Sequence, residues 1–160
     1  MRMVQFDTRA AHGSRSLARL ALVQIAGAML ASEARAQALD WVQNPASGKW
    51  YAQTPGPTSW TAAEAFAQSF GAHLATVRSP AENAWLDANF FSALTLFRHH
   101  WIGLYQDRAD PNYSEPSGGW KWASGEPFGF ANWAPGAPDN AGGHQDFARS
   151  TGRSGGPSGE

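Results

Sequence analysis

The 160-residue chain contains no cysteine, and charged residues make up only 16% of it. Without cysteine the protein cannot use disulfides, a thiol nucleophile or a thiolate zinc site. No Gly-x-Ser-x-Gly string, phosphate-binding loop or dinucleotide fingerprint occurs, and no set of nucleophile, base and orienting group can be assembled. The sequence therefore predicts a protein that is not an enzyme and that relies on packing for its stability.

Long apolar runs are also scarce, and the one that exists lies near the N-terminus. Leu20–Leu30 is apolar except for Gln24 and follows a segment with four arginines. Ala34-Arg-Ala36 and Ala36-Gln-Ala38 both have the small-x-small pattern of a cleavage site, and the apolar run is too short to span a bilayer. We predict that residues 1–38 are a signal peptide and that the product is secreted or periplasmic, with no membrane span.

The rest of the chain, 122 residues, is long enough for one domain with a modest core. It has 7 lysines and arginines against 11 aspartates and glutamates, a formal charge of −4, which argues against nucleic acid as a partner. All eight tryptophans lie in this part, and most should pack inside the domain. Residues 149–160 contain no apolar side chain, so we predict a domain over 39–148 and a disordered tail over 149–160.

Two helices are predicted from capping signals. Thr58 or Ser59 can cap the first helix, Thr61 and Glu64 have the spacing of a capping box, and Gly71 can end the helix in a left-handed conformation. The second helix begins at Ser79-Pro-Ala-Glu82, where serine caps, proline takes the first helical position and the glutamate can reach back. The apolar stripes expected to be buried are Ala62, Phe66 and Phe70 in the first helix, and Leu86 and Phe90 in the second.

Short strands should surround these helices. Two are expected on either side of the Asn44–Gly48 turn, and a third over 73–77. His100–Tyr105 is apolar and rich in β-formers, which is typical of a central strand. The alternation in Trp120-Lys-Trp122 places both indoles on one face of a further strand. The fold class is therefore α+β.

A long loop is expected to carry the function. Residues 125–143 are rich in glycine and proline, and a loop of this length in a compact domain is usually functional. Oxygen-bearing side chains gather at Asp139, Asn140, Gln145 and Asp146, after Trp133. Oxygen donors on an irregular loop suit a hard cation such as Ca²⁺, with a ligand held beside it.

The ordered motifs resemble the C-type lectin-like domain. The strings that match the family, in the family's order, are WTAAEA (60–65), GAHLATV (71–77), SPAEN (79–83), WIGL (101–104), WKWASG (120–125), NW (132–133) and GAPDN (136–140). The resemblance runs from about Trp41 to about Phe147. It implies a double-looped α+β fold whose long loop, about Asp107–Asp146, binds calcium and sugar, with carbohydrate or a glycoconjugate as the partner.

The resemblance also locates the site, residue by residue. Ala137 stands where sugar-binding members have Glu or Gln, so one ligand is lost, while Pro138, commonly preceded by a cis peptide bond, and Asp139 match. The resemblance assigns Asp139, Asn140, Gln145 and Asp146 as weak calcium ligands. For the sugar it assigns Asp139, Asn140 and Trp133, although Trp133 has an alternative role as a core residue.

The family's later elements, a Trp-Asn-Asp string and a closing strand that pairs back to the N-terminal one, do not follow Ala148. We therefore expect calcium binding to be weakened or lost, an open edge on the sheet, and a chain that is truncated or frame-shifted. Two alternatives stay open at this point: a metal-independent domain that binds protein or another surface, and a non-functional fragment.

Overall fold

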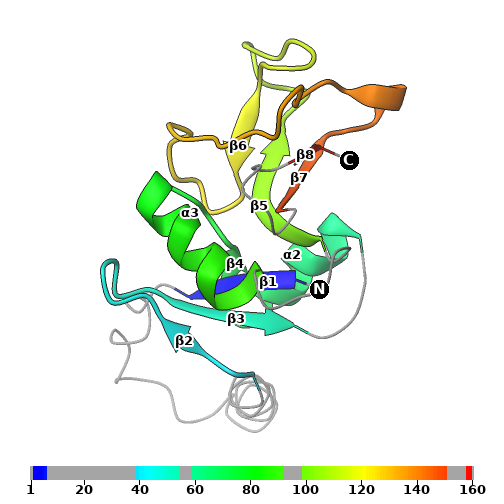
Figure 1. The fold of residues 1–160 in the computed structure, drawn as a ribbon. Coiled ribbons are helices and arrows are strands. Elements are labelled where there is room, and N and C mark those ends of the chain that lie inside the picture. Colours follow the sequence, from blue (N-terminus) through cyan, green and yellow to red (C-terminus); the bar gives the residue numbers. More distant parts are fainter. Residues whose placement is uncertain (1, 7–38, 55–58, 92–98, 151–157, 160) are drawn as a thin grey trace, which may run out of the picture.

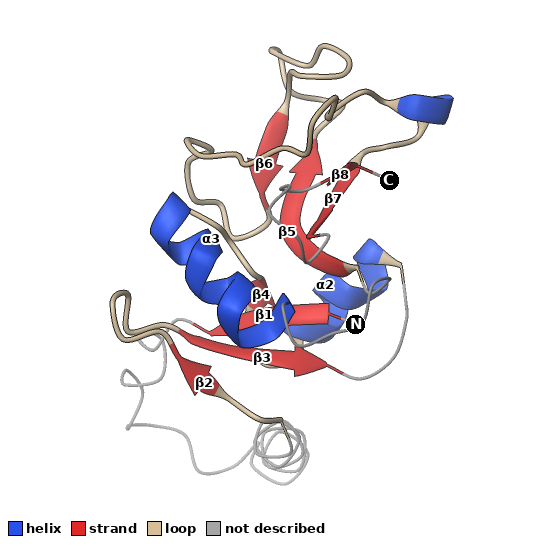
Figure 2. Ribbon diagram, in the orientation of Figure 1, coloured by secondary structure: helices blue, strands red, loops and turns tan. Residues whose placement is uncertain are grey.

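The computed structural model describes residues 2–6, 39–54, 59–91, 99–150 and 158–159. Within these ranges the sheet has eight strands, in the order β2-β3-β1-β5-β7-β8, with β4 paired to β1 and β6 paired to β5. The strands are β1 (Arg2–Phe6), β2 (Val42–Gln43), β3 (Trp50–Thr54), β4 (His73–Leu74), β5 (His100–Gln106), β6 (Trp120–Trp122), β7 (Phe147–Ser150) and β8 (Ser158–Gly159). Together with two α-helices they confirm the α+β class (Figure 2).

The first helix, α2 (Trp60–Gln68), begins where its cap predicts. The Ser59 hydroxyl accepts a hydrogen bond from the Ala62 N–H, and Gly71 has a positive φ of 69° after the helix ends. The predicted buried stripe is wrong at Ala62, which is exposed. The helix buries Trp60, Ala63 and Ala67 instead, as their spacing of three and four allows.

The second helix, α3 (Pro80–Leu86), continues into a π-helical turn, Asp87–Phe91. Ser79 caps it by accepting the Glu82 N–H, and Pro80 takes the first helical position, as predicted. Leu86 and Phe90 are buried against Tyr51 in the main core cluster, which confirms the stripe expected for this helix.

The central strand prediction is confirmed. β5 contacts β6 and β7 in antiparallel pairing and β1 in parallel pairing, and Ile102 and Leu104 are buried. Both indoles of β6, Trp120 and Trp122, lie in the same core cluster. The strand predicted over 73–77 is shorter, with only His73 and Leu74 in β4.

Two segments lie where the sequence predicted something else. Arg2–Phe6, expected to belong to a signal peptide, forms β1 and pairs along all of β3. β7 extends to Ser150, past the residue at which the tail was expected to begin, and β8 pairs with it. The sequence predicted an open edge on the sheet without assigning it to a strand, and in this structure β1 covers one edge of β3.

The long loop and β6 lie at one end of the molecule, and the β2–β3 hairpin lies at the other (Figure 1). Among the described residues, no helix has both the length and the apolar character that a membrane crossing requires.

Candidate functional site

The base of the long loop is held by an ion-pair cluster. Glu126 accepts hydrogen bonds from the Arg78 guanidinium and from Lys49 Nζ, the latter at 2.9 Å. These contacts tie the loop to the segment before α3 and to the residue before β3. The bond from Arg78, with further help from Lys49, lowers the pKa of Glu126 to about 2. Glu126 is therefore ionised throughout the physiological range and fixes the start of the loop.

Aromatic pairs hold the loop further along. The Trp133 ring lies 4.9 Å from that of Trp120, centroid to centroid, and Trp133 packs against the main core cluster. Past the end of the loop, Phe147 stacks on Trp60 at 4.8 Å with an angle of 21°. The Gln106 N–H donates to the Asp146 carbonyl at 2.7 Å. Both ends of the loop are therefore held by packing and hydrogen bonds, and the residues between them form its tip.

The predicted site residues occupy the tip and its return to the sheet. Asp139 is exposed, and its Oδ1 accepts the Ala141 N–H at 3.2 Å. Asn140 has a φ of 49°, and its Oδ1 accepts the Gln145 N–H at 3.1 Å. The peptide bond between Ala137 and Pro138 is cis, as the resemblance implies. Asp139 and Asn140 therefore use one oxygen each to shape the loop itself.

Asp146 has a different partner, which the sequence did not reveal. The Arg108 guanidinium donates to both carboxylate oxygens of Asp146, at 3.0 to 3.2 Å. This interaction raises the pKa of Arg108. A two-point bridge of this kind fixes geometry as well as charge. The two residues are 38 positions apart, so no local pattern could have indicated the pair.

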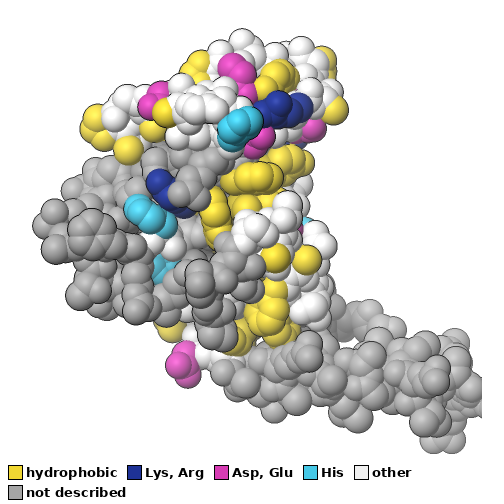
Figure 3. Space-filling view, turned by 90° about the vertical axis from the view of Figure 1, so that its right-hand side faces the viewer, with side chains coloured by type: hydrophobic (Ala, Val, Ile, Leu, Met, Phe, Trp, Pro, Cys, Tyr) yellow, Lys and Arg dark blue, Asp and Glu magenta, His cyan; other side chains and the backbone are white. Residues whose placement is uncertain are grey.

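A second ion-pair group stands at the beginning of the same region. Lys121 Nζ contacts Asp107 at 2.8 Å and Asp110 at 2.7 Å. The hydrogen bonds from Lys121 lower the pKa of both aspartates. Figure 3 shows acidic side chains at this end of the molecule with basic side chains and a histidine among them. Asp107, Asp110 and Asp146 each have a cationic partner.

The donor set does not fit a complete calcium site. Ca²⁺ takes six to eight oxygens and usually several carboxylates. Asp139, Asn140, Gln145 and Asp146 provide two carboxylates and two amides, and Asp146 is engaged by Arg108. Over the described ranges, no group of three or more His, Cys, Asp or Glu side chains is placed to hold a metal ion.

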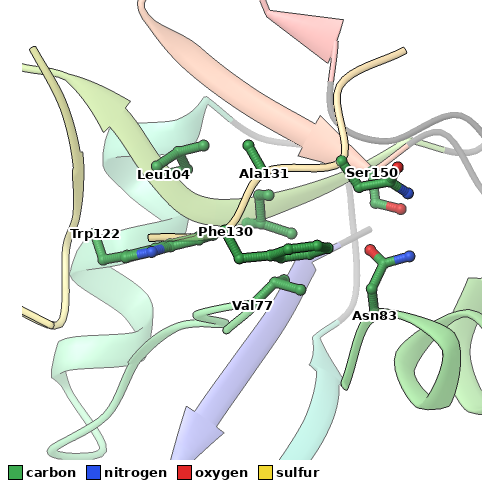
Figure 4. A pocket seen from close by; sticks show the side chains of 9 residues that line it. Val77, Asn83, Leu104, Trp122, Phe130, Ala131 and Ser150 are labelled. Atoms are coloured by element: carbon green, nitrogen blue, oxygen red, sulfur yellow. The ribbon is translucent and has the colours of Figure 1, made fainter. Parts of the chain in front are cut away.

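A small pocket, with a cavity volume of about 10 Å³, lies apart from the loop tip. Phe130 lies over Val77 and beside Trp122, while Asn83 from α3 and Ser150 at the end of β7 face it from the open side (Figure 4). Its walls are mostly apolar. A sugar presents many hydroxyls that need polar partners, so the pocket suits carbohydrate less well than the loop does.

The fold and the loop define a class of protein: an α+β binding domain in which a long irregular loop with exposed oxygen donors is mounted on a small sheet. A family model described as Lectin C-type domain matches residues 56–156. The chain belongs to this family, which confirms the resemblance, and the match continues beyond Ala148.

Individual relatives agree with the family. The chain is 34% identical over 108 residues to C-type lectin domain family 10 member A of Homo sapiens, covering 66% of this chain and 29% of that protein. It is 37% identical over 90 residues to ladderlectin of Oncorhynchus mykiss, covering 54% of this chain and 42% of that protein. The chain thus spans less than half the length of these curated relatives.

A solved structure shows the same fold. The cow C-type carbohydrate-recognition domain of CD23, determined in the presence of a GlcNAc2Man3 oligosaccharide, superposes with a TM-score of 0.52. The match has 22% sequence identity and covers 65% of this chain and 70% of that chain.

Proposed function

We propose that this protein is an exported carbohydrate-binding module of the C-type lectin family in which calcium dependence is weakened or lost. Family membership supports the carbohydrate partner, as do relatives such as asialoglycoprotein receptor 1 of Rattus norvegicus, which is 32% identical over 108 residues. The single observation that carries the calcium part is the bridge from Arg108 to Asp146.

In this proposal Asp139 is the chief sugar contact. Its carboxylate is exposed and has acceptor positions beyond the one used by Ala141, so it can accept hydrogen bonds from sugar hydroxyls. Asn140 assists from the neighbouring position. Trp133 lies within the loop, and its packing on Trp120 gives it a positioning role beside any contact with the sugar.

In this proposal the Arg108 guanidinium takes over part of the role that a bound metal ion would have. A guanidinium on Asp146 neutralises this carboxylate and holds Asp146 beside the start of the loop region. A divalent ion at the same carboxylate would have to displace Arg108 against the repulsion of its fixed positive charge. The loop is therefore ordered without metal, and calcium adds little to its stability.

The test uses the full chain on a glycan array, with calcium and with a chelator. We expect a glycan signal that survives chelation, and a several-fold loss in Asp139→Asn. The matched control is Asp40→Asn, which removes the same charge from an exposed position at the other end of the domain. Binding that vanishes on chelation would refute the calcium part, and a cooperatively melting sample with no glycan bound would refute the carbohydrate part.

Arg108→Gln tests the role assigned to the bridge. It frees Asp146, so calorimetry should show a several-fold gain in affinity for Ca²⁺ over the parent chain. Calcium should shift the melting temperature of the variant more than that of the parent, because only a ligand that binds the folded state can shift unfolding. Equal calcium responses in the two proteins would contradict this role.

The same bridge favours a second candidate, a metal-independent domain that binds protein through this loop. The glycan array separates the two candidates. The second candidate predicts a folded protein that binds no glycan. It also predicts that Asp139→Asn weakens binding to a protein partner and that Asp40→Asn does not.

A further inference from the structure

Strand β1 occupies the middle of the sheet, although it comes from the far N-terminus. It pairs antiparallel with β3 over five positions, from Arg2 opposite Thr54 to Phe6 opposite Trp50. On its other side it pairs antiparallel with β4 and, at Arg2 opposite Trp101, parallel with β5. In the strand order, β1 is the link between β3 and β5 (Figure 1).

Without β1 this position would be a slot lined by backbone groups. On the side of β3 away from β1, the described residues pair β2 with Trp50 and Tyr51. With β1 in place, Tyr51, Ala52 and Thr54 are all buried. Without β1, the edge of β3 that pairs with it would lose its strand partner. Buried backbone groups without partners cost free energy, and such an edge accepts any strand that can supply the missing bonds.

The segment that fills the slot is the segment that the sequence assigns to a signal peptide. Residues 7–38 separate β1 from the rest of the domain in the sequence, and the entropy cost of bringing two chain positions together rises only slowly with the number of residues between them. Cleavage after Ala38 would detach β1 and empty the slot. Export processing and completion of the sheet therefore compete for the same residues.

We propose that the slot between β3 on one side and β4 and β5 on the other is a strand-binding site, whose occupant is this chain's own Arg2–Phe6 segment. The segment acts as a separable complementing strand. Recognition is by main-chain hydrogen bonds in antiparallel register with β3, which is the general mode of strand addition to a sheet edge. Without Arg2–Phe6, the edge of β3 is unpaired and can bind the same strand when it is supplied as a separate peptide.

Because the chain has no cysteine, engineered disulfides can test the register in the full-length protein. Met3 lies opposite Gln53, and residues opposite each other in antiparallel strands have Cα atoms about 4.5–5.5 Å apart, which a disulfide can bridge. Met3→Cys with Gln53→Cys should form an intramolecular disulfide on mild oxidation. The control, Met3→Cys with Ser47→Cys, places the second thiol on the exposed turn before β3 and should cross-link far less.

Each single-cysteine chain must melt cooperatively, which shows that a failure to cross-link is not a failure to fold. Equal cross-linking of both pairs, or none in the Met3–Gln53 pair of a folded chain, would overturn the proposal. Hydrogen exchange on the unmodified chain gives a second readout. Amides of residues 2–6 should exchange as slowly as those of β3, and exchange at the rate of an unstructured peptide would equally overturn it.

A third arm tests separability. Val4→Pro in the full chain removes an N–H in the middle of β1 and should lower the melting temperature. A synthetic peptide of residues 1–8 should restore part of the loss in trans, whereas the same peptide N-methylated at Val4 should not. An unchanged melting temperature in Val4→Pro, or equal rescue by both peptides, would count against a strand-binding site. If the Val4→Pro chain does not fold without peptide, a cooperative melt that returns with the unmodified peptide and not with the N-methylated one supports the strand-binding site.

Discussion

Replacing Glu126 by glutamine should weaken the base of the loop in a way that depends on pH. The carboxylate is about one third exposed and is bound by Arg78 and by Lys49. Its pKa in the folded protein is about 2, against an ordinary value of 4.5. A difference of this size would correspond to about 3 kcal/mol if none of it were screened. Solvent screening at a partly exposed site reduces this, and we expect a loss of about 1–2 kcal/mol at pH 7.

The sign follows from linkage. Because the folded pKa of Glu126 is depressed, its contribution is fully present above the unfolded pKa of about 4.5 and is lost as the pH falls through about 2. The parent should therefore lose stability between pH 4.5 and 2 through this group, and Glu126→Gln should not. The gap between the two proteins should narrow towards zero at the acid end of this window.

Urea unfolding of both proteins at pH 7, 4 and 2.5 measures the gap. Glu115→Gln is the matched control, because Glu115 is an exposed glutamate between β5 and β6 that accepts a hydrogen bond from the Tyr113 hydroxyl. It should change the free energy of unfolding by no more than a few tenths of a kcal/mol at any of these values. A Glu126→Gln loss that is the same at pH 2.5 as at pH 7 would refute the electrostatic reasoning and point to lost packing.

Two further substitutions test the frame on which the loop is mounted. Gly103→Ala should destabilise the protein by roughly 1–3 kcal/mol, because a Cβ there would lie 2.6 Å from the Leu74 carbonyl oxygen. Gly129→Ala is the control, because a Cβ at that position meets nothing within 4 Å. Equal melting temperatures of the two variants would contradict the close approach at Gly103. Tyr51→Phe should cost about 1–3 kcal/mol in urea unfolding at pH 7, because the buried hydroxyl donates to Glu82 at 2.5 Å and a carboxylate loses a partner. A neutral result would mean that Glu82 is fully satisfied by its other donors.

Local signals in the sequence predicted local structure well. The caps at Ser59 and Ser79 and the left-handed Gly71 each depend on a few neighbouring residues, so they could be inferred without the fold. The capping box predicted from Thr61 and Glu64 is wrong, because Ser59 caps the helix and the Glu64 side chain bonds to another segment. This buried carboxylate accepts hydrogen bonds from His73 and from the Leu74 N–H, so a tertiary contact with β4 uses the side chain that the motif assigned to the helix end.

The binding roles of the loop residues stay predictions, and the structure adds contacts that the sequence did not indicate. The resemblance placed Asp139, Asn140 and Asp146 on one loop, and the structure keeps them there. The partner of Asp146 is a cation from a distant segment, and such a pairing depends on how the loop folds back on β5. The role of β1 was missed for a related reason: arginines before an apolar run are typical of a signal peptide, and nothing local indicates a strand that pairs with β3 and β5.

The two ion-pair groups can hold the loop in shape in place of a bound metal ion. Lys121 holds Asp107 and Asp110 together, and Arg108 joins Asp146 to the same region. Each cation does what a bound metal would do for one or two carboxylates, and each adds a fixed positive charge that repels a metal. These groups are partly exposed, so salt should loosen them, whereas a buried metal cage would resist salt. Ionic strength, more than calcium, is therefore the variable that should govern the order of this loop.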